Sequence, residues 1–232
     1  MNESVIVALD TDAHTALALA RSIAGLVRYV KVGMTLFYAE GPLIVARLRD
    51  LGFDVFLDLK LHDIPHQVEG AAREISRLGV SMFTVHASGG REMMAAAVRG
   101  ACEGSVECGA DTPDVLAVTV LTSLSSQDLA QTGIERSTAA QVATLGGLAR
   151  EAGVQGVVCS PHEASAMRGL LGREALVVTP GVRPAGSERG DQARVATPAE
   201  AIASGASHLV VGRPVSGAAD PVHALSRILE EL

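Results

Sequence analysis

Short runs of β-branched and apolar residues alternate with longer segments rich in Ala, Leu and Arg along the whole chain, and this alternation restricts the fold more than any other feature. Eight of the short runs have the length and composition of buried strands, at residues 5–9, 29–32, 55–60, 82–86, 115–121, 156–159, 176–179 and 209–212. Helix-like segments lie between them, at residues 15–26, 43–51, 68–78, 91–99, 139–152, 162–171 and 221–232. Alternation of this kind predicts parallel strands joined by crossover helices.

Eight such units within 232 residues predict the α/β class and a single closed (β/α)8 barrel, a TIM barrel, covering residues 1–232. An open parallel sheet more often has about five or six strands. No Gly-x-Gly-x-x-Gly follows the first expected strand, so the usual sign of a dinucleotide-binding fold is missing. Active sites of barrels lie at the carboxyl ends of the strands, so the residues that end each run are the candidates for function.

Ionisable residues stand at the ends of the first three expected strands, where the pattern otherwise indicates core. Because residues two apart share one face of a strand, Asp58 and Lys60 are expected to point together toward the barrel axis. Asp10 and Lys31 end the first and second strands, and Asp63 follows the third. A buried unpaired charge is costly, so these residues are either paired or functional. A purely structural ion-pair network is one reading, but alternating charges from three successive strand ends favour an active site.

Glycine and arginine follow the seventh and eighth expected strands, in TPGVRP at 179–184 and VVGRPV at 210–215. Loops at this place in barrels commonly bind phosphate through backbone N–H groups. Gly181 and Gly212 permit close approach of the backbone, and Arg213 can donate two hydrogen bonds to phosphate oxygens. These two segments therefore predict an anion site beside the charged strand ends.

Two longer segments, at residues 122–137 and 181–198, carry little apolar periodicity and are predicted to be irregular. The second is rich in Gly, Pro and Arg. Loops of this length in a compact domain are often functional, and in a barrel they lie on the face that carries the active site. Residues 181–198 are therefore expected to act as a lid that excludes water.

The charge balance argues against a nucleic-acid or membrane partner. With 19 basic and 26 acidic residues the net charge is −7, whereas a binder of nucleic acid or anionic lipid usually presents a basic face. No apolar stretch approaches the roughly 18 residues of a membrane span, and the N-terminal residues lack the pattern of a signal peptide. Cys102, Cys108 and Cys159 form no CxxC pair and are expected to be reduced thiols. The chain is predicted to be a soluble cytoplasmic protein.

Several short motifs occur together along the chain. They are VALD at 7–10, VKVG at 30–33, DLKLHDIP at 58–65, VLTS at 120–123, TPGVRP at 179–184, DQ at 191–192 and GRP at 212–214. In these motifs the chain resembles the orotidine 5′-phosphate decarboxylase family over nearly its whole length, and the D-x-K-x-x-D element is specific to a small group of related barrels. The resemblance implies a (β/α)8 barrel, a homodimer, and a carboxy-lyase that converts orotidine 5′-phosphate to UMP in the last step of pyrimidine nucleotide synthesis. It also implies that no metal ion or organic cofactor is used.

The resemblance further implies roles for the charged residues. Lys60 would donate a proton to C6, the pyrimidine carbon that loses carbon dioxide, and Asp58 would lie beside the substrate carboxylate. Asp10 and Lys31 would hold ribose hydroxyls. Asp63 would reach into the partner subunit's site, contact ribose there, and complete a chain of charges with the two lysines and Asp58.

Other residues would bind the substrate by the same resemblance. Thr122 would recognise the pyrimidine. The phosphate would be surrounded by residues of the late motifs and the segment between them, which are Pro180, Arg183, Gln192, Gly212 and Arg213, with Gln192 bridging toward the base. Gln67 stands where the family usually has a Thr that contacts the neighbouring subunit's ribose. A Gln can still donate a hydrogen bond there, but it is longer and changes the geometry of that contact.

The implied reaction leaves a poorly delocalised carbanion on the pyrimidine ring, and no PLP or thiamine motif is evident to act as an electron sink. A fixed ammonium is the natural substitute, and two neighbouring carboxylates favour the ionised form of Lys60. At about 4 Å, the attraction between this ammonium and the carbanion contributes only about 4 kcal/mol at an effective dielectric near 20. Difficult reactions need their activation free energy lowered by about 20 kcal/mol. Preorganised charges and binding of the phosphate must supply the rest.

Two other functions are compatible with such a barrel. The first is a metal-dependent phosphosugar lyase or epimerase, since some of these share the D-x-K-x-x-D element. Lys31 argues against it because an ammonium repels a divalent cation, and His62, His66 and His86 form no convincing ligand set. The second is a nucleotide-binding barrel that has lost catalysis, and the presence of all the charged residues argues against that.

Overall fold

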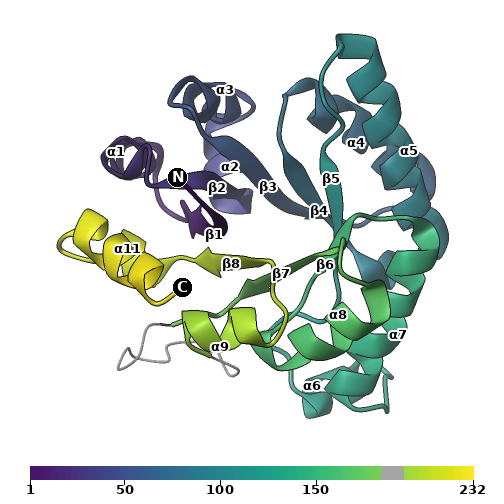
Figure 1. The fold of residues 1–232 in the computed structure, drawn as a ribbon. Coiled ribbons are helices and arrows are strands. Elements are labelled where there is room, and N and C mark those ends of the chain that lie inside the picture. The colour runs from purple at the N-terminus through teal and green to yellow at the C-terminus, as the bar shows by residue number, and fades with distance from the viewer. Residues whose placement is uncertain (184–195) are drawn as a thin grey trace.

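The computed structural model describes residues 1–183 and 196–232, and its eight strands close into one parallel barrel (Figure 1). Each strand pairs with its neighbours in chain order, and β1 pairs with β8 to complete the ring. The strands are β1 Asn2–Ala8, β2 Val27–Gly33, β3 Asp54–Leu61, β4 Met82–His86, β5 Asp114–Val118, β6 Gly156–Val158, β7 Leu176–Pro180 and β8 His208–Val211. The predicted (β/α)8 barrel is confirmed, and each predicted strand overlaps one of these elements.

Helices lie around the outside of the barrel, as Figure 1 shows. They are α1 Ala13–Ile23, α2 Met34–Glu40, α3 Leu43–Asp50, α4 Pro65–Arg77, α5 Gly90–Cys108, α6 Ser126–Gln131, α7 Thr138–Ala152, α8 Ala164–Leu171, α9 Pro198–Ala203, α10 Arg213–Ser216 and α11 Pro221–Glu230, with 3₁₀ turns at Ala87–Gly89 and Pro161–Glu163. The first and last helices, α1 and α11, pack against each other. Across the described ranges, none of the helices combines the length and the apolar character that a bilayer span requires.

The prediction that residues 122–137 are irregular is wrong for Ser126–Gln131, which form α6. Ser125 caps this helix: its hydroxyl accepts from the Asp128 N–H, while the Asp128 carboxylate accepts from the Ser125 N–H. The short helices α2, α9 and α10 were also not predicted, and α5 runs well beyond its predicted end. A helix of one or two turns has too few positions for an apolar period to show, which explains why periodicity missed them.

Prolines and polar caps mark the starts of four of the longer helices, α1, α4, α7 and α11. Pro65 starts α4 and Pro221 starts α11, and proline suits this position because the first helical N–H needs no intrahelical partner. Asp12 and Ser137 cap α1 and α7 by accepting hydrogen bonds from backbone N–H groups of the first turn. Since α4 begins at Pro65, Asp63 lies in the short turn between β3 and that helix.

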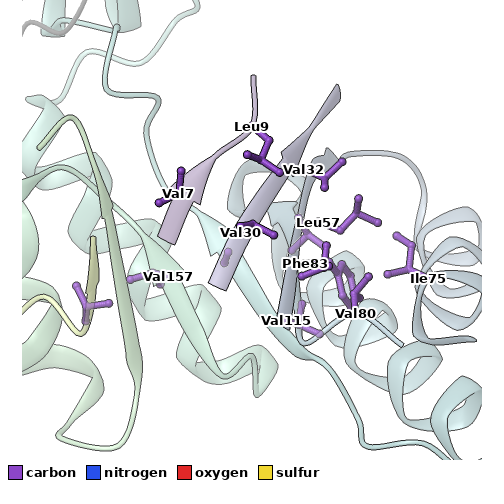
Figure 2. Packing of buried hydrophobic residues seen from close by; sticks show 14 of the residues in the cluster. Val7, Leu9, Val30, Val32, Leu57, Ile75, Val80, Phe83, Val115 and Val157 are labelled. Carbon is purple, nitrogen blue, oxygen red and sulfur yellow. The ribbon is translucent and has the colours of Figure 1, made fainter. Parts of the chain in front are cut away.

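Apolar side chains form two layers, one on each side of the barrel wall. The residues that face the axis form the smaller cluster, which contains Ile6, Ala8, Phe56, Met82, Leu116, Val178 and Val210. Their neighbours along the strands point outward to the helices, and Figure 2 shows Val7, Val30 and Leu57 in this outer layer. Leu59 also packs against the outer cluster, so the prediction that Leu57 and Leu59 face the helices is confirmed.

Candidate active site

A cavity of about 430 Å³ opens among the carboxyl ends of the strands. Charged residues from the ends of β1, β2 and β3 line one part, and they are Asp10, Lys31, Asp58 and Lys60. Residues that follow β7 and β8 line a second part, together with Pro180 at the end of β7, and they are Gly181, Arg183, Gly212, Arg213 and Ser216. The remaining wall is mostly apolar and consists of Ala8, Phe56, Val118, Val120, Leu121, Thr122, Val158, Cys159 and Val210.

The four charged residues form a continuous series of ion pairs across the first three strands. Lys31 Nζ lies 2.8 Å from Asp10 Oδ1 and 3.4 Å from Asp58 Oδ2. Lys60 Nζ lies 2.8 Å from Asp58 Oδ1. The side chains of Lys31 and Asp58 are only 9% and 13% exposed, so their ion pair lies largely out of solvent. The strand ends therefore bring the predicted charges together at the barrel mouth.

Lys60 reaches this place through an unusual backbone conformation. Its φ is 54°, and among the described residues it is the one non-glycine residue with a positive φ. Between Leu57 and Leu61 the pairing of β3 with β4 shifts its register. Simple alternation predicted that Asp58 and Lys60 share a face. The contact between them is present, but an irregular stretch of strand produces it.

Asp58 is held in its ionised form by its neighbours. Burial raises the pKa of its carboxyl, but the charges of Lys31 and Lys60 and hydrogen bonds from Lys60 and Thr84 outweigh burial, so this pKa lies below its usual value. The Thr84 hydroxyl donates to Asp58 Oδ1 at 2.9 Å. Sequence reasoning missed Thr84. The signal that could have found it is its position on β4 two residues after Met82, on the face that points to the barrel axis.

Asp10 and Lys31 depend on Gly33, which ends β2. A Cβ atom on Gly33 would lie 2.7 Å from Asp10 Oδ1 and 3.2 Å from Lys31 Nζ. Any side chain there would therefore push the carboxylate away from the ammonium. This steric need explains the glycine in the VKVG motif, and sequence reasoning had assigned it no role.

The second part of the cavity presents two arginines. Burial and the nearby charge of Arg213 lower the pKa of Arg183. Two guanidinium groups that repel each other at one cavity favour an anionic ligand, since its charge stabilises both. Gly181 has a φ of 81°, in the left-handed region that favours glycine. Ser216 of α10 also lines this part and was not among the predicted residues.

The predicted site residues fall into three groups. Ten line the cavity: Asp10, Lys31, Asp58, Lys60, Thr122, Pro180, Gly181, Arg183, Gly212 and Arg213. Asp63 and Gln67 instead line a neighbouring groove of about 450 Å³, which also includes Lys60. Gln192 and most of the predicted lid lie outside the described residues. Within one chain, then, Asp63 does not line the main cavity, and its predicted contact with a partner subunit stays a prediction.

Histidines lie close to Lys60. The rings of His62 and His86 are 5.3 Å apart between centroids. Burial lowers the pKa of His86, and the nearby charges of His62 and Lys60 lower it further, which favours a neutral ring at neutral pH. Within residues 1–183 and 196–232, no group of three or more His, Cys, Asp or Glu residues has an arrangement that could hold a metal ion.

The fold and the cavity define a class of protein: a (β/α)8 barrel whose ligand site, at the carboxyl ends of its strands, combines paired charges with an arginine-lined anion site. Comparison with known proteins narrows this class. The model of the Orotidine 5′-phosphate decarboxylase / HUMPS family matches residues 3–228. The chain belongs to this family.

Individual relatives agree with the family match. Orotidine 5′-phosphate decarboxylase of Anaeromyxobacter sp. strain K is 51% identical over 228 residues, which cover 98% of this chain and 97% of the relative. The enzyme of that name from Moorella thermoacetica is 49% identical over 232 residues, covering 99% and 92%. The crystal structure of the orotidine 5′-phosphate decarboxylase from Lactobacillus acidophilus has a TM-score of 0.86 at 39% identity, over 99% of each chain. That from Pyrococcus horikoshii, with a TM-score of 0.76 at 23% identity over 98% of each chain, shows the same fold.

Proposed function

We propose that this protein decarboxylates orotidine 5′-phosphate to UMP without a metal ion or organic cofactor. The observation that carries the proposal is the Lys60 ammonium at the cavity, 2.8 Å from Asp58 Oδ1, with Lys31 on the other oxygen of the same carboxylate. Family membership and the printed names of the relatives support the same reaction.

In this proposal the nucleotide lies across the cavity. The phosphate binds beside the two cations that line the cavity, Arg183 and Arg213, and the pyrimidine lies against the apolar wall near Thr122. Asp10 and Lys31 hold the ribose hydroxyls. This orientation places the carboxylate on C6 toward Asp58 and Lys60.

The reaction then proceeds in two steps at C6, cleavage of a carbon–carbon bond and transfer of a proton. The bond between C6 and the carboxylate breaks, carbon dioxide leaves, and the electron pair of that bond remains on C6. The Lys60 ammonium stabilises this negative charge and transfers a proton to C6, which gives UMP. The neutral amine regains its proton from solvent before the next turnover. Asp58 keeps Lys60 oriented and, by its own charge, disfavours the bound substrate carboxylate.

Binding energy from the phosphate supplies what the lysine cannot. A single charge at about 4 Å stabilises the carbanion by about 4 kcal/mol at an effective dielectric near 20. This is much less than the reduction in activation free energy of roughly 20 kcal/mol that a difficult reaction needs. Interactions with the non-reacting phosphate can hold the reacting carbon against preorganised charges, so that their attraction is strongest in the transition state.

We further infer that the protein acts as a homodimer in which Asp63 contributes to its partner's site. The groove that Asp63 lines is bordered by Met34 and Tyr38, whose side chains are exposed, with Tyr38 72% exposed. Ile64, next to Asp63, is 63% exposed. Large exposed apolar groups beside a charged site are typical of a surface covered by another protein chain. The cytoplasmic location stays a prediction.

The direct test mixes the purified protein with orotidine 5′-phosphate, without added metal and with EDTA, and follows the loss of absorbance of the substrate. We expect turnover that EDTA does not reduce, and no turnover by Lys60→Ala, which should still bind UMP. Turnover that EDTA abolishes would contradict a reaction without a metal ion, and a protein that neither turns over orotidine 5′-phosphate nor binds UMP would favour the phosphosugar class of enzyme. Tight binding of UMP by the wild-type protein with no decarboxylation would indicate a barrel that has lost catalysis.

A further inference from the structure

Thr84 joins the two residues at the centre of the proposed reaction. Its side chain is fully buried. Its hydroxyl accepts a hydrogen bond from the backbone N–H of Lys60 and donates one to Asp58 Oδ1, each at 2.9 Å. A hydroxyl carries one donor and two acceptor sites, so one threonine can serve both partners at once.

Lys60 needs such a contact because its backbone is strained. Non-glycine residues keep a positive φ only where the surrounding structure holds them there. The register of pairing between β3 and β4 shifts between Leu57 and Leu61, so the regular ladder is interrupted around Lys60. The hydrogen bond from the Lys60 N–H to the Thr84 hydroxyl satisfies the backbone donor at this interruption.

Asp58 needs the same contact for its orientation. Oδ1 receives both the Thr84 hydroxyl and the Lys60 ammonium, whereas Oδ2 faces Lys31. The bond from Thr84 is the third contact of the carboxylate and the second to Oδ1. It restricts rotation of the carboxylate, so that each oxygen stays with its own lysine. Threonine suits this task because its branched side chain has few allowed rotamers.

We propose that Thr84 is a positioning residue whose hydroxyl holds the Lys60 backbone in its left-handed conformation and fixes the Asp58 carboxylate, so that the Lys60 ammonium is aimed into the cavity. Thr84 is not among the residues that line the cavity, so it acts through Lys60 and Asp58. The inference rests on the proposed decarboxylase function and adds to it a residue outside the ligand's reach. Because a misplacement of about 1 Å can cost about 100-fold in rate, loss of the hydroxyl should affect turnover more than binding.

The test compares three variants with the wild-type protein. Thr84→Val removes the hydroxyl and keeps the branched shape, and Thr84→Ser keeps the hydroxyl. Thr119→Val is the matched control: Thr119 is 4% exposed, follows β5, and donates its hydroxyl at 2.9 Å to the carbonyl of Val158 rather than to a charged group. The measurements are kcat and KM for orotidine 5′-phosphate, Kd for UMP, and thermal unfolding to establish that each variant is folded.

We expect Thr84→Val to lower kcat about 100-fold while KM and the Kd for UMP change less than about threefold. Thr84→Ser and Thr119→Val should keep kcat within about threefold of the wild-type value. A role of Thr84 in stability alone would lower the unfolding temperature and leave kcat of the folded protein unchanged. Should Thr84→Val fail to fold, Thr84→Ala takes its place with the same expected loss.

If the wild-type protein is an active decarboxylase, any of three results would overturn the positioning role of Thr84. They are an undiminished kcat for Thr84→Val, a kcat of Thr84→Ser as low as that of Thr84→Val, and an equal loss in Thr119→Val. If the wild-type protein does not decarboxylate orotidine 5′-phosphate, the proposed function is wrong, but the positioning role of Thr84 is still open to test. A crystal structure of Thr84→Val then decides the positioning role, which is supported if Lys60 leaves the left-handed region or its contact with Asp58 lengthens, and overturned if both stay unchanged.

Discussion

Lys60 combines a useful charge with an unfavourable backbone. The left-handed region costs a non-glycine residue about 1–2 kcal/mol, and Lys60 occupies it at a φ of 54°. Regular pleating would continue the ladder with β4, whereas the observed conformation interrupts it and leaves the ammonium against Asp58. Strain of this kind is retained where the surrounding contacts hold it and where the position of the side chain matters.

Replacing Lys60 by glycine and by alanine separates the backbone from the charge. Both variants lose the ammonium and are expected to lose turnover, but only glycine adopts a positive φ without steric cost. We expect Lys60→Gly to be more stable than Lys60→Ala by about 1 kcal/mol, measured by urea unfolding. At an ordinary extended position the order is reversed, so an alanine variant as stable as the glycine variant would contradict a left-handed conformation at this residue.

The lowered pKa of Asp58 links the stability of the fold to pH. A carboxyl whose pKa is lower in the folded than in the unfolded state stabilises the fold fully above the unfolded value of about 3.9, and this contribution is lost as the pH falls through the folded value. The difference in unfolding free energy between wild type and Asp58→Asn should therefore be largest near neutral pH and shrink below about pH 4. Urea unfolding of both proteins across this range measures it. A difference that does not vary with pH would show that Asp58 is not the titrating group.

The pair of helices α4 and α5 shows how elements outside the barrel support the site. A Cβ on Gly100 would collide with the backbone carbonyl of Glu69, and one on Gly104 with that of Arg73. Ion pairs such as Arg73 with Glu103 also join the two helices, but exposed pairs contribute only about 0–1 kcal/mol each. Close contact of the backbones is therefore the main restraint on α4, whose first residue follows the turn that carries Asp63.

Alanine substitutions at two helical glycines test this packing. Gly100→Ala is expected to destabilise the protein by about 1–3 kcal/mol, because the added methyl forces α5 away from α4. Gly147→Ala in α7 is the matched control, since a Cβ there meets nothing within 4 Å. It is expected to stabilise the protein by about 0.5–1 kcal/mol through helix propensity alone. Thermal unfolding measures both changes, and shifts of the same sign would contradict the packing argument.

The molecule as a whole offers two neighbouring concave surfaces that share Lys60, the main cavity and the groove that Asp63 lines. In the proposed homodimer, a twofold axis would bring the groove of one subunit to the cavity of the other, so that each site uses residues of both chains. This arrangement would explain why Asp63 belongs to the same motif as Asp58 and Lys60 yet stays outside the cavity of its own chain.

Mixed dimers test this sharing directly. A dimer of one Lys60→Ala chain and one Asp63→Ala chain should contain one intact site, and it is expected to recover up to about half of the wild-type activity. A dimer of Lys60→Ala and Asp10→Ala chains is the control, because both residues serve the same chain's cavity and no intact site forms. Activity of heterodimers purified with two affinity tags is the measurement, and equal activity of the two mixtures would contradict the shared site.

Local patterns along the chain were enough to predict the barrel, its strands, most of its helices, and the charged and glycine residues at the strand ends that line its cavity. The resemblance to a known family added Thr122, Pro180 and Arg183. The burial of strand residues and the alternation of their side chains repeat with a fixed period along the chain. They can therefore be recognised in the sequence without knowing which strands are neighbours. The charges at the ends of the first three strands follow from the same rule, since parallel strands end on one edge of the barrel.

The contacts that make the cavity specific depend instead on residues far apart in sequence. The Thr84 hydroxyl bridges Asp58 and Lys60, which lie 26 and 24 residues earlier. Gly33 is required by the carboxylate of Asp10, which follows β1, and the left-handed conformation of Lys60 accompanies an interruption of the sheet. No local period carries this information, because these contacts are set by distances between strands that exist only after the barrel has closed.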